Sequence, residues 1–125
     1  MAAGTLVSSG SSGSMPTGSG SERLCRASIH NLNADTQEIL SGVAGHIYTI
    51  ISIICSSQVS ASQTISIKVN DGSNDIVILS GETLPIDGTF IFSDRFVMEE
   101  DDDLDVYNSG TNADWYVSYI DQNWV

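Results

Sequence analysis

GHIYTIISIIC, residues 45–55, is the longest run of apolar and β-branched residues in this chain. Five of its eleven residues are isoleucines, whose branched side chains are stiff at χ1 and pack well on a pleated surface, so the run predicts a strand. Turn-forming residues bound it on both sides, SGVAG at 41–45 and SSQ at 56–58. Because it is apolar almost throughout, we expect this strand at the centre of a sheet, with other structure covering both of its faces.

The segments before and after this run alternate apolar and polar residues, as strands with one buried face do. The clearest case is QTISIKVN at residues 63–70. Residues 22–32 alternate as well, with Cys25, Ala27, Ile29 and Asn31 on one face and Leu24, Arg26, Ser28 and His30 on the other. Further strands are expected at residues 75–79, 89–99, 104–107 and 114–121, with a break at Ser93-Asp94 in the second of these.

Residues typical of turns separate these segments. Turns are predicted at 70–74, where Gly72 can take a positive φ, and at 101–103 and 108–112, with loops at 80–82 and 85–88. NADTQEIL, residues 33–40, predicts either one helical turn capped by Asp35 or a loop, because so short a segment makes a marginal helix.

Seven or eight short strands with no convincing helix predict an all-β antiparallel β-sandwich. Jelly-roll and immunoglobulin-like arrangements both suit such a strand count. The Cys–Trp–Cys order of immunoglobulin domains fails here, because both tryptophans follow both cysteines along the chain. We therefore expect a jelly-roll-like sandwich over residues 22–125.

Residues 1–21, MAAGTLVSSGSSGSMPTGSGS, are dominated by Gly and Ser and cannot bury enough apolar area to offset the entropy of ordering them. This composition predicts an extended N-terminal arm that takes its shape from a neighbouring subunit, with Leu6 and Val7 as its apolar anchor. An alternative is that SSGSSGS is a cloning remnant and Met15 the native start. No positive charge precedes the short apolar patch, so we expect no signal peptide.

The charge balance excludes several classes of partner. Sixteen acidic and four basic residues give a formal net charge of −12. This argues against nucleic-acid binding, which needs cations to displace condensed counterions, and against adhesion to anionic membranes. No apolar run is long enough to predict a membrane span.

Cys25 and Cys55 lie in apolar strand segments, so we expect a reduced, buried pair rather than a disulfide.

Asp101, Asp103 and Asp105 have the D-x-D-x-D spacing of a calcium-binding loop. An EF-hand also needs glycine at the sixth position and a glutamate at the twelfth, where this chain has Val106 and Asn112. The segment is therefore expected to be a solvated acidic turn or an acidic docking surface, with a looser divalent-cation site as the alternative.

Nothing else in the sequence recommends a chemistry. His30 and His46 have no metal-ligand spacing with Cys25 or Cys55, so we expect both histidines to be structural. No nucleophile-elbow or phosphate-loop motif is present, and we expect no enzymatic activity and no cofactor. A Cys-His or Ser-His-Asp arrangement stays open at this point, because such groups meet only in space.

Four aromatic residues gather near the C-terminus. In a strand, Trp115 and Tyr119 share one face with Val117, which favours the core, whereas Tyr116 falls on the other face. Trp124 lies beyond the strand. Tyr116 and Trp124 are therefore candidates for a subunit interface, with sugar stacking as the alternative.

From about residue 42 onward the chain resembles small structural proteins of tailed-phage virions. The resemblance rests on HIYTIISIIC, TISIKVNDGSNDIVIL, LPIDGTFIFSDRFVMEEDD, LDVYNSG and SYIDQNW in that order. It implies a β-sandwich used as a capsid decoration (cement) protein or as a tail, neck or fibre component.

The interpretation we favour is a capsid decoration protein. It would bind between major capsid subunits, and the resemblance implies a homotrimer on the virion surface, assembled in the host cytoplasm. The interface would include Leu6, Val7, Arg23, Arg26, Tyr116 and Trp124. The alternative is a tail, neck or fibre module, such as a glycan-binding adhesin.

Overall fold

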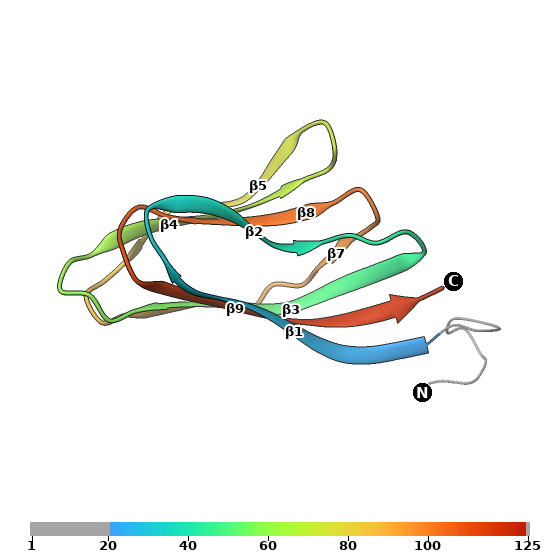
Figure 1. Cartoon of the computed structure of the whole chain (residues 1–125), viewed down its shortest axis with the longest axis horizontal. Coiled ribbons are helices and arrows are strands. Elements are labelled where there is room, and N and C mark those ends of the chain that lie inside the picture. The colour runs from blue at the N-terminus through green and yellow to red at the C-terminus, as the bar shows by residue number, and fades with distance from the viewer. Residues whose placement is uncertain (1–20, 125) are drawn as a thin grey trace.

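The computed structural model describes residues 21–124, which form two antiparallel β-sheets packed face to face (Figure 1). The strands are β1 (Ser21–Leu32), β2 (Asp35–Ser41), β3 (His46–Ser57), β4 (Gln63–Asn70), β5 (Asp75–Leu84), β6 (Thr89–Phe92), β7 (Phe96–Met98), β8 (Asp103–Asn108) and β9 (Ala113–Asn123). The predicted all-β antiparallel sandwich is confirmed. A membrane-spanning helix is not found anywhere in residues 21–124.

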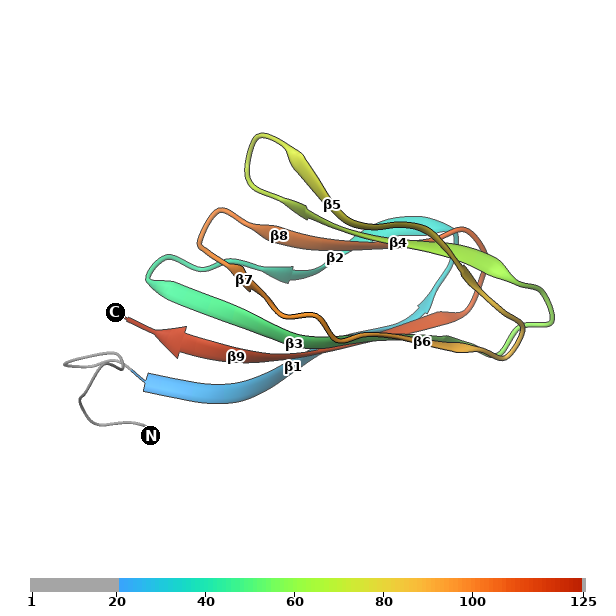
Figure 2. The same ribbon diagram turned by 180° about the vertical axis from the view of Figure 1, so that it is seen from behind.

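The strand order is that of a jelly roll. One sheet has the order β1-β9-β3-β6, with β7 also paired to β3, and the other has the order β2-β8-β4-β5. β6 and β7 pair with different parts of β3, so they act as one strand interrupted at residues 93–95, where a break was predicted. The first strand thus lies beside the last, the second beside the second-last, and β4 beside β5, which is the nesting of a jelly roll. Figure 2 shows the same two layers from behind.

The core lies between the sheets and is built by alternate residues of each strand. Trp115 and Val117 of β9 lie there, as their alternation predicted, together with Leu104 and Val106 of β8, and all four are essentially inaccessible to solvent. The other buried apolar residues are Leu32, Leu40, Tyr48, Ile50, Ile53, Cys55, Ile65, Ile67, Val69, Leu84, Met98 and Ala113. Each large side chain of this set contributes roughly 1.5–3 kcal/mol by leaving water.

A β-bulge explains the unbroken isoleucines of β3. The register of β3 against β9 shifts between Ile50 and Ser52, which leaves Ile51 as the extra residue. The inward positions therefore change phase, from Tyr48 and Ile50 before the bulge to Ile53 and Cys55 after it.

Two predictions about elements were wrong. Residues 33–40 were predicted to form a helical turn or a loop. Most of this segment belongs instead to strand β2, Asp35–Ser41, which pairs with β8 and buries Leu40. Residues 80–82 are not a loop either, because β5 continues through them along β4 to Leu84. Two register shifts in the β4–β5 pair, together with the positive φ of Gly81, accommodate the turn-like residues within the strand.

A third prediction holds for only one face of β3. The strand is central, between β9 and β6/β7, and its inward face is covered by the second sheet. Its outward face, which includes Ile47, Thr49 and Ile54, is half-buried and meets no second layer among residues 21–124. The predicted arm at residues 1–21 lies outside the described part of the chain except for Ser21, which begins β1.

Candidate interaction surface

The outward face of the five-stranded sheet is apolar, and we call it the outer face. Two rows of side chains cross it. One row contains Ser28, Tyr116, Ile54 and Ile91 in register on β1, β9, β3 and β6. The other contains Leu24, Ile120, Thr49 and Val97 on β1, β9, β3 and β7. The apolar members, together with Ile47, therefore lie on the same sheet face, with Arg26, Ser118 and Ser52 between the two rows.

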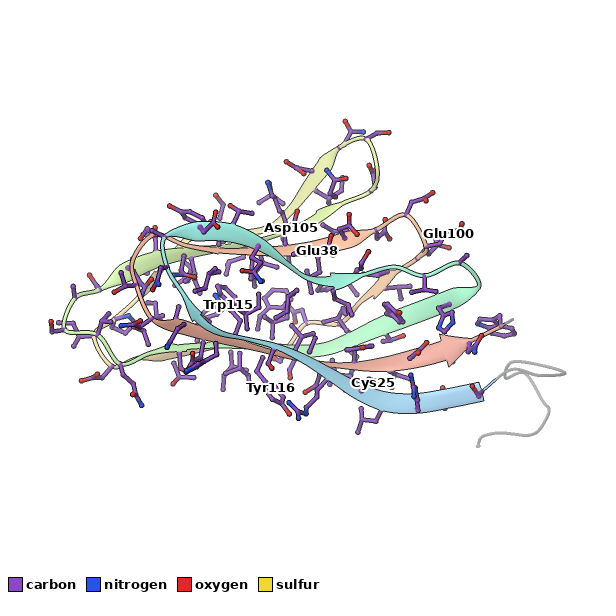
Figure 3. All side chains as sticks on the ribbon, viewed as in Figure 1. Cys25, Glu38, Glu100, Asp105, Trp115 and Tyr116 are labelled. Carbon is purple, nitrogen blue, oxygen red and sulfur yellow. The ribbon has the colours of Figure 1, made fainter. Side chains whose placement is uncertain are left out.

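Several of these side chains are strongly exposed. Leu24 is 73% exposed, Ile91 61%, Val97 56% and Tyr116 40%. Single exposed apolar residues are ordinary, but several gathered on one sheet face indicate an interaction site. Figure 3 shows the contrast on β9, where Trp115 points between the sheets and Tyr116 points away from them.

Polar groups border the outer face along β1 and β9. The Arg26 guanidinium lies over the Tyr116 ring, 5.7 Å from its centroid, which is a cation–π distance. Nearby, His30 Nδ1 lies 2.8 Å from Asp114 Oδ1, and the same oxygen accepts a hydrogen bond from the Asn31 N–H at 2.9 Å. A shallow hollow beside Tyr116 is lined by Ser28, His30, Ile54, Ser56, Asp114 and Tyr116.

The outward face of the four-stranded sheet is acidic, and we call it the acidic face. Glu38 of β2 and Asp105 of β8 lie directly opposite each other (Figure 3). Asp103 lies two residues before Asp105 on β8. Desolvation raises the pKa of Glu38, and the charges of Asp103 and Asp105 raise it further. Burial likewise raises the pKa of Asp105, although Lys68 opposes this shift. Lys68 in turn donates to Asp75 at 3.1 Å.

The three aspartates of the calcium-like motif do not converge. Asp101 lies in the β7–β8 turn, where it lines a shallow hollow with Asp71, Glu99, Glu100 and Asp102. Asp103 and Asp105 lie instead within β8, where Asp103 Oδ1 accepts a hydrogen bond from Ser41 at 2.7 Å. No group of three or more His, Cys, Asp or Glu side chains in residues 21–124 is arranged to hold a metal ion.

The histidines and cysteines occupy separate positions. His46 Nδ1 lies 2.8 Å from Asp121 Oδ1, and the Asp121 carboxylate is only 7% exposed. Arg23 reaches the same carboxylate at 3.8 Å. Cys25 of β1 lies opposite Tyr119 of β9, two strands away from His46 on β3. Cys55 is buried in the core, and this burial raises the pKa of its thiol to about 12. Both cysteines are free thiols.

The predicted interface residues fall at different places. Arg26 and Tyr116 lie together on the outer face, whereas Arg23 lies at one end of the sandwich beside Asp121. Trp124 is 44% exposed and its backbone N–H donates to the Gly45 carbonyl, beyond the end of β9. Tyr116 and Trp124 are eight positions apart along extended chain, roughly 26 Å at about 3.3 Å per residue, so the two rings cannot form one stacking platform. Leu6 and Val7 lie outside the described residues.

Sequence patterns did not single out most of the outer face, namely Ile47, Ile54, Ile91, Val97 and Ile120. The signal was present in the isoleucines on both faces of β3. They predict a strand with other structure covering both of its faces, whereas one face is open among residues 21–124.

Comparisons with known proteins show a likeness to a solved structure but not to a known family. No family model matches the chain, and no curated protein matches it. Among solved structures, the chain is similar to one in the acidic stable capsid structure of Helicobacter pylori bacteriophage KHP30, with a TM-score of 0.52 and 6% sequence identity. The match covers 85% of this chain and 94% of that chain. At this identity the likeness shows a shared fold.

Proposed function

We propose that this chain is a non-enzymatic structural protein of a tailed-phage virion, and that it decorates the capsid by binding to the major capsid protein. The fold it shares with a chain from a phage capsid supports the proposal, since nearly the whole of both chains takes part in the match. The sequence phrases that resemble small virion proteins support it independently.

The observation that carries the proposal is the contrast between the two sheet faces. Leu24, Ile91 and Val97 are more than half exposed on the outer face, while Glu38, Asp103 and Asp105 gather on the acidic face. An apolar face of this kind gains free energy when a partner covers it. We propose that the outer face docks on the capsid and that the acidic face points to solvent, where like charge keeps decorated particles apart.

The N-terminal segment extends this surface. β1 is an edge strand of the sheet that carries the outer face, and its first residue, Ser21, directly follows this segment in sequence. We propose that it lies across a neighbouring capsid subunit, with Leu6 and Val7 as its anchor. Two linked contacts bind more tightly than either alone, because the second forms at a high effective concentration.

The test is binding of purified protein to capsids that lack it, measured as copies bound per particle. Ile91→Lys combined with Val97→Lys is expected to reduce occupancy at least tenfold, because it puts two charges into the docking surface. Val77→Lys is the matched control, since Val77 is 62% exposed on β5 of the other sheet. Deletion of residues 2–20 tests the arm separately and is expected to abolish binding while the body stays folded.

Each part of the proposal can fail separately. Full occupancy by the Ile91/Val97 variant would refute docking through the outer face, and full occupancy by the deletion variant would refute the arm. Labelled virions that carry a few copies at the tail would replace decoration with a tail role.

One observation favours a glycan-binding module as the second candidate. The exposed Tyr116 ring stands beside Arg26 and a shallow hollow lined partly by His30 and Asp114, and aromatic rings with polar neighbours suit sugars. A glycan array probed with the wild type, Tyr116→Ala and Trp124→Ala separates the two functions. Reproducible binding that Tyr116→Ala removes would support the adhesin, and an array without signal would exclude it for the sugars printed.

A further inference from the structure

The free edge of β1 offers main-chain pairing to another strand. β1 is bonded to β9 on one side, and no strand within residues 21–124 pairs with its other side. The strand is twelve residues long and contains no proline, so a partner strand could follow it over several residues. Exposed edges of this kind are templates for pairing with a second chain.

The outward-facing residues at the start of β1 are arranged symmetrically about Leu24. Glu22 and Arg26 have opposite charges and flank Leu24 at equal distances, and Leu24 is 73% exposed. All three lie on the outer face, where Gln122 donates to Glu22 at 3.0 Å and Arg26 lies over Tyr116. We propose that β1 pairs antiparallel with β1 of a second copy, about a two-fold axis at Leu24.

This register brings unlike charges together twice. When Leu24 of one copy faces Leu24 of the other, Glu22 of each copy faces Arg26 of its neighbour, and such cross-strand pairs attract. A register centred on Glu22 or Arg26 would place like charges directly opposite each other, and one centred on Cys25 would place Leu24 against Arg26. Charges commonly discourage edge pairing, but here their symmetry favours a single register.

The pairing would double the docking surface. The two five-stranded sheets would become continuous, and their outer faces would lie side by side. Such a contact is isologous and closes with two copies, so the homotrimer implied by the resemblance would need a different surface. The inference does not rest on the proposed function, because it concerns the isolated full-length protein.

Charge exchange tests the register. We expect wild-type protein to sediment at twice the mass of one chain. Glu22→Arg alone and Arg26→Glu alone each place like charges opposite each other at both pairs, and both variants should be monomeric at that concentration. The double variant should dimerise again. An equimolar mixture of the two single variants should form a heterodimer, because each unlike pair is restored, and this recovery also shows that both variants are folded.

Arg95→Glu is the matched control, since it makes the same charge change in the β6–β7 connection and should leave the dimer intact. A monomeric or trimeric wild type would overturn the proposal. So would single variants that dimerise as well as the wild type, or a mixture that stays monomeric. None of these measurements uses capsids, so failure here is distinct from failure of the proposed function.

Discussion

At the scale of single residues, Asn108 joins the two sheets through one buried side chain. Its Nδ2 donates to the carbonyl of Leu32 at 2.8 Å and to Gln63 Oε1 at 3.1 Å, and its Oδ1 accepts from Trp115 Nε1 at 3.1 Å. Asn108 is on β8 and Trp115 is on β9, so the last of these bonds crosses between the sheets. The buried Asn108 amide is tolerated because both its nitrogen and its oxygen have hydrogen-bond partners.

Asn108→Ala should therefore be strongly destabilising. It leaves the Trp115 Nε1–H and the Leu32 carbonyl without their bonds to Asn108, and each orphaned buried group costs about 1–3 kcal/mol, so we expect a loss of about 3 kcal/mol. Urea denaturation followed by tryptophan fluorescence measures the change. Gln37→Ala, which removes an exposed amide from β2, should change stability by less than about 0.5 kcal/mol. Equal effects of the two substitutions would contradict the role given to Asn108.

Sequence patterns could predict the inward residues but not this network. Alternation predicts Trp115 and Val117 in the core, because period two is a property of any strand. Asn108 was assigned to a turn, since asparagine favours turns and its partner Leu32 lies 76 residues away. The arrangement of the aspartates at 101–105 likewise depends on where the strand begins. Their spacing puts them on one face only if all three lie in a strand, and β8 begins at Asp103.

At the scale of elements, β2 and β8 pair despite facing like charges. Glu38 lies opposite Asp105, and the pKa of Glu38 is raised, chiefly by desolvation, so the folded chain binds this proton more tightly than the unfolded chain does. The folded state is therefore penalised above the raised pKa, and stability recovers as the pH falls through it towards the ordinary value of 4.5.

Glu38→Gln should stabilise the protein at pH 7 by about 0.5 kcal/mol, because it removes a like-charge pair that lies directly across two strands. The gain should disappear near pH 4, where the wild-type carboxyl is itself protonated. Thermal unfolding at the two pH values measures the difference. Glu82→Gln on β5 serves as the control. A gain from Glu38→Gln that is independent of pH would show that charge is not its cause.

Local patterns predicted some elements better than others. The hairpin of β4 and β5 could be predicted because its alternation, its turn and its partner are adjacent in sequence. β2 could not, because it is a short, charged edge strand that depends on β8, more than 60 residues away, for its hydrogen bonds. Its burial of Leu40 is also decided by that distant partner.

At the scale of the whole molecule, the jelly roll sorts the side chains onto two unlike surfaces. Strands from both ends and the middle of the chain form the five-stranded sheet, so Leu24, Ile54, Ile91 and Tyr116 meet on the outer face although they are distant in sequence. The acidic face gathers its carboxylates from β2 and β8 in the same way. Alternation within single strands cannot reveal either surface, because the order of strands in a sheet is set by long-range pairing.

Docking through the outer face and docking through the acidic face predict different effects of salt on capsid occupancy. If the outer face docks on the capsid, occupancy should change less than twofold between 50 and 500 mM NaCl, because burial of apolar area depends weakly on simple salts. If the acidic face docks on basic capsid patches instead, occupancy should fall steeply, since at the higher concentration the screening length is only about 4–5 Å. Glu38→Gln combined with Asp105→Asn sharpens the comparison, because it removes two of the three carboxylate charges named on the acidic face and leaves the outer face unchanged. We expect this variant to decorate capsids as fully as the wild type. A salt-sensitive wild type together with a weakened variant would assign docking to the acidic face and reverse the orientation proposed for the protein.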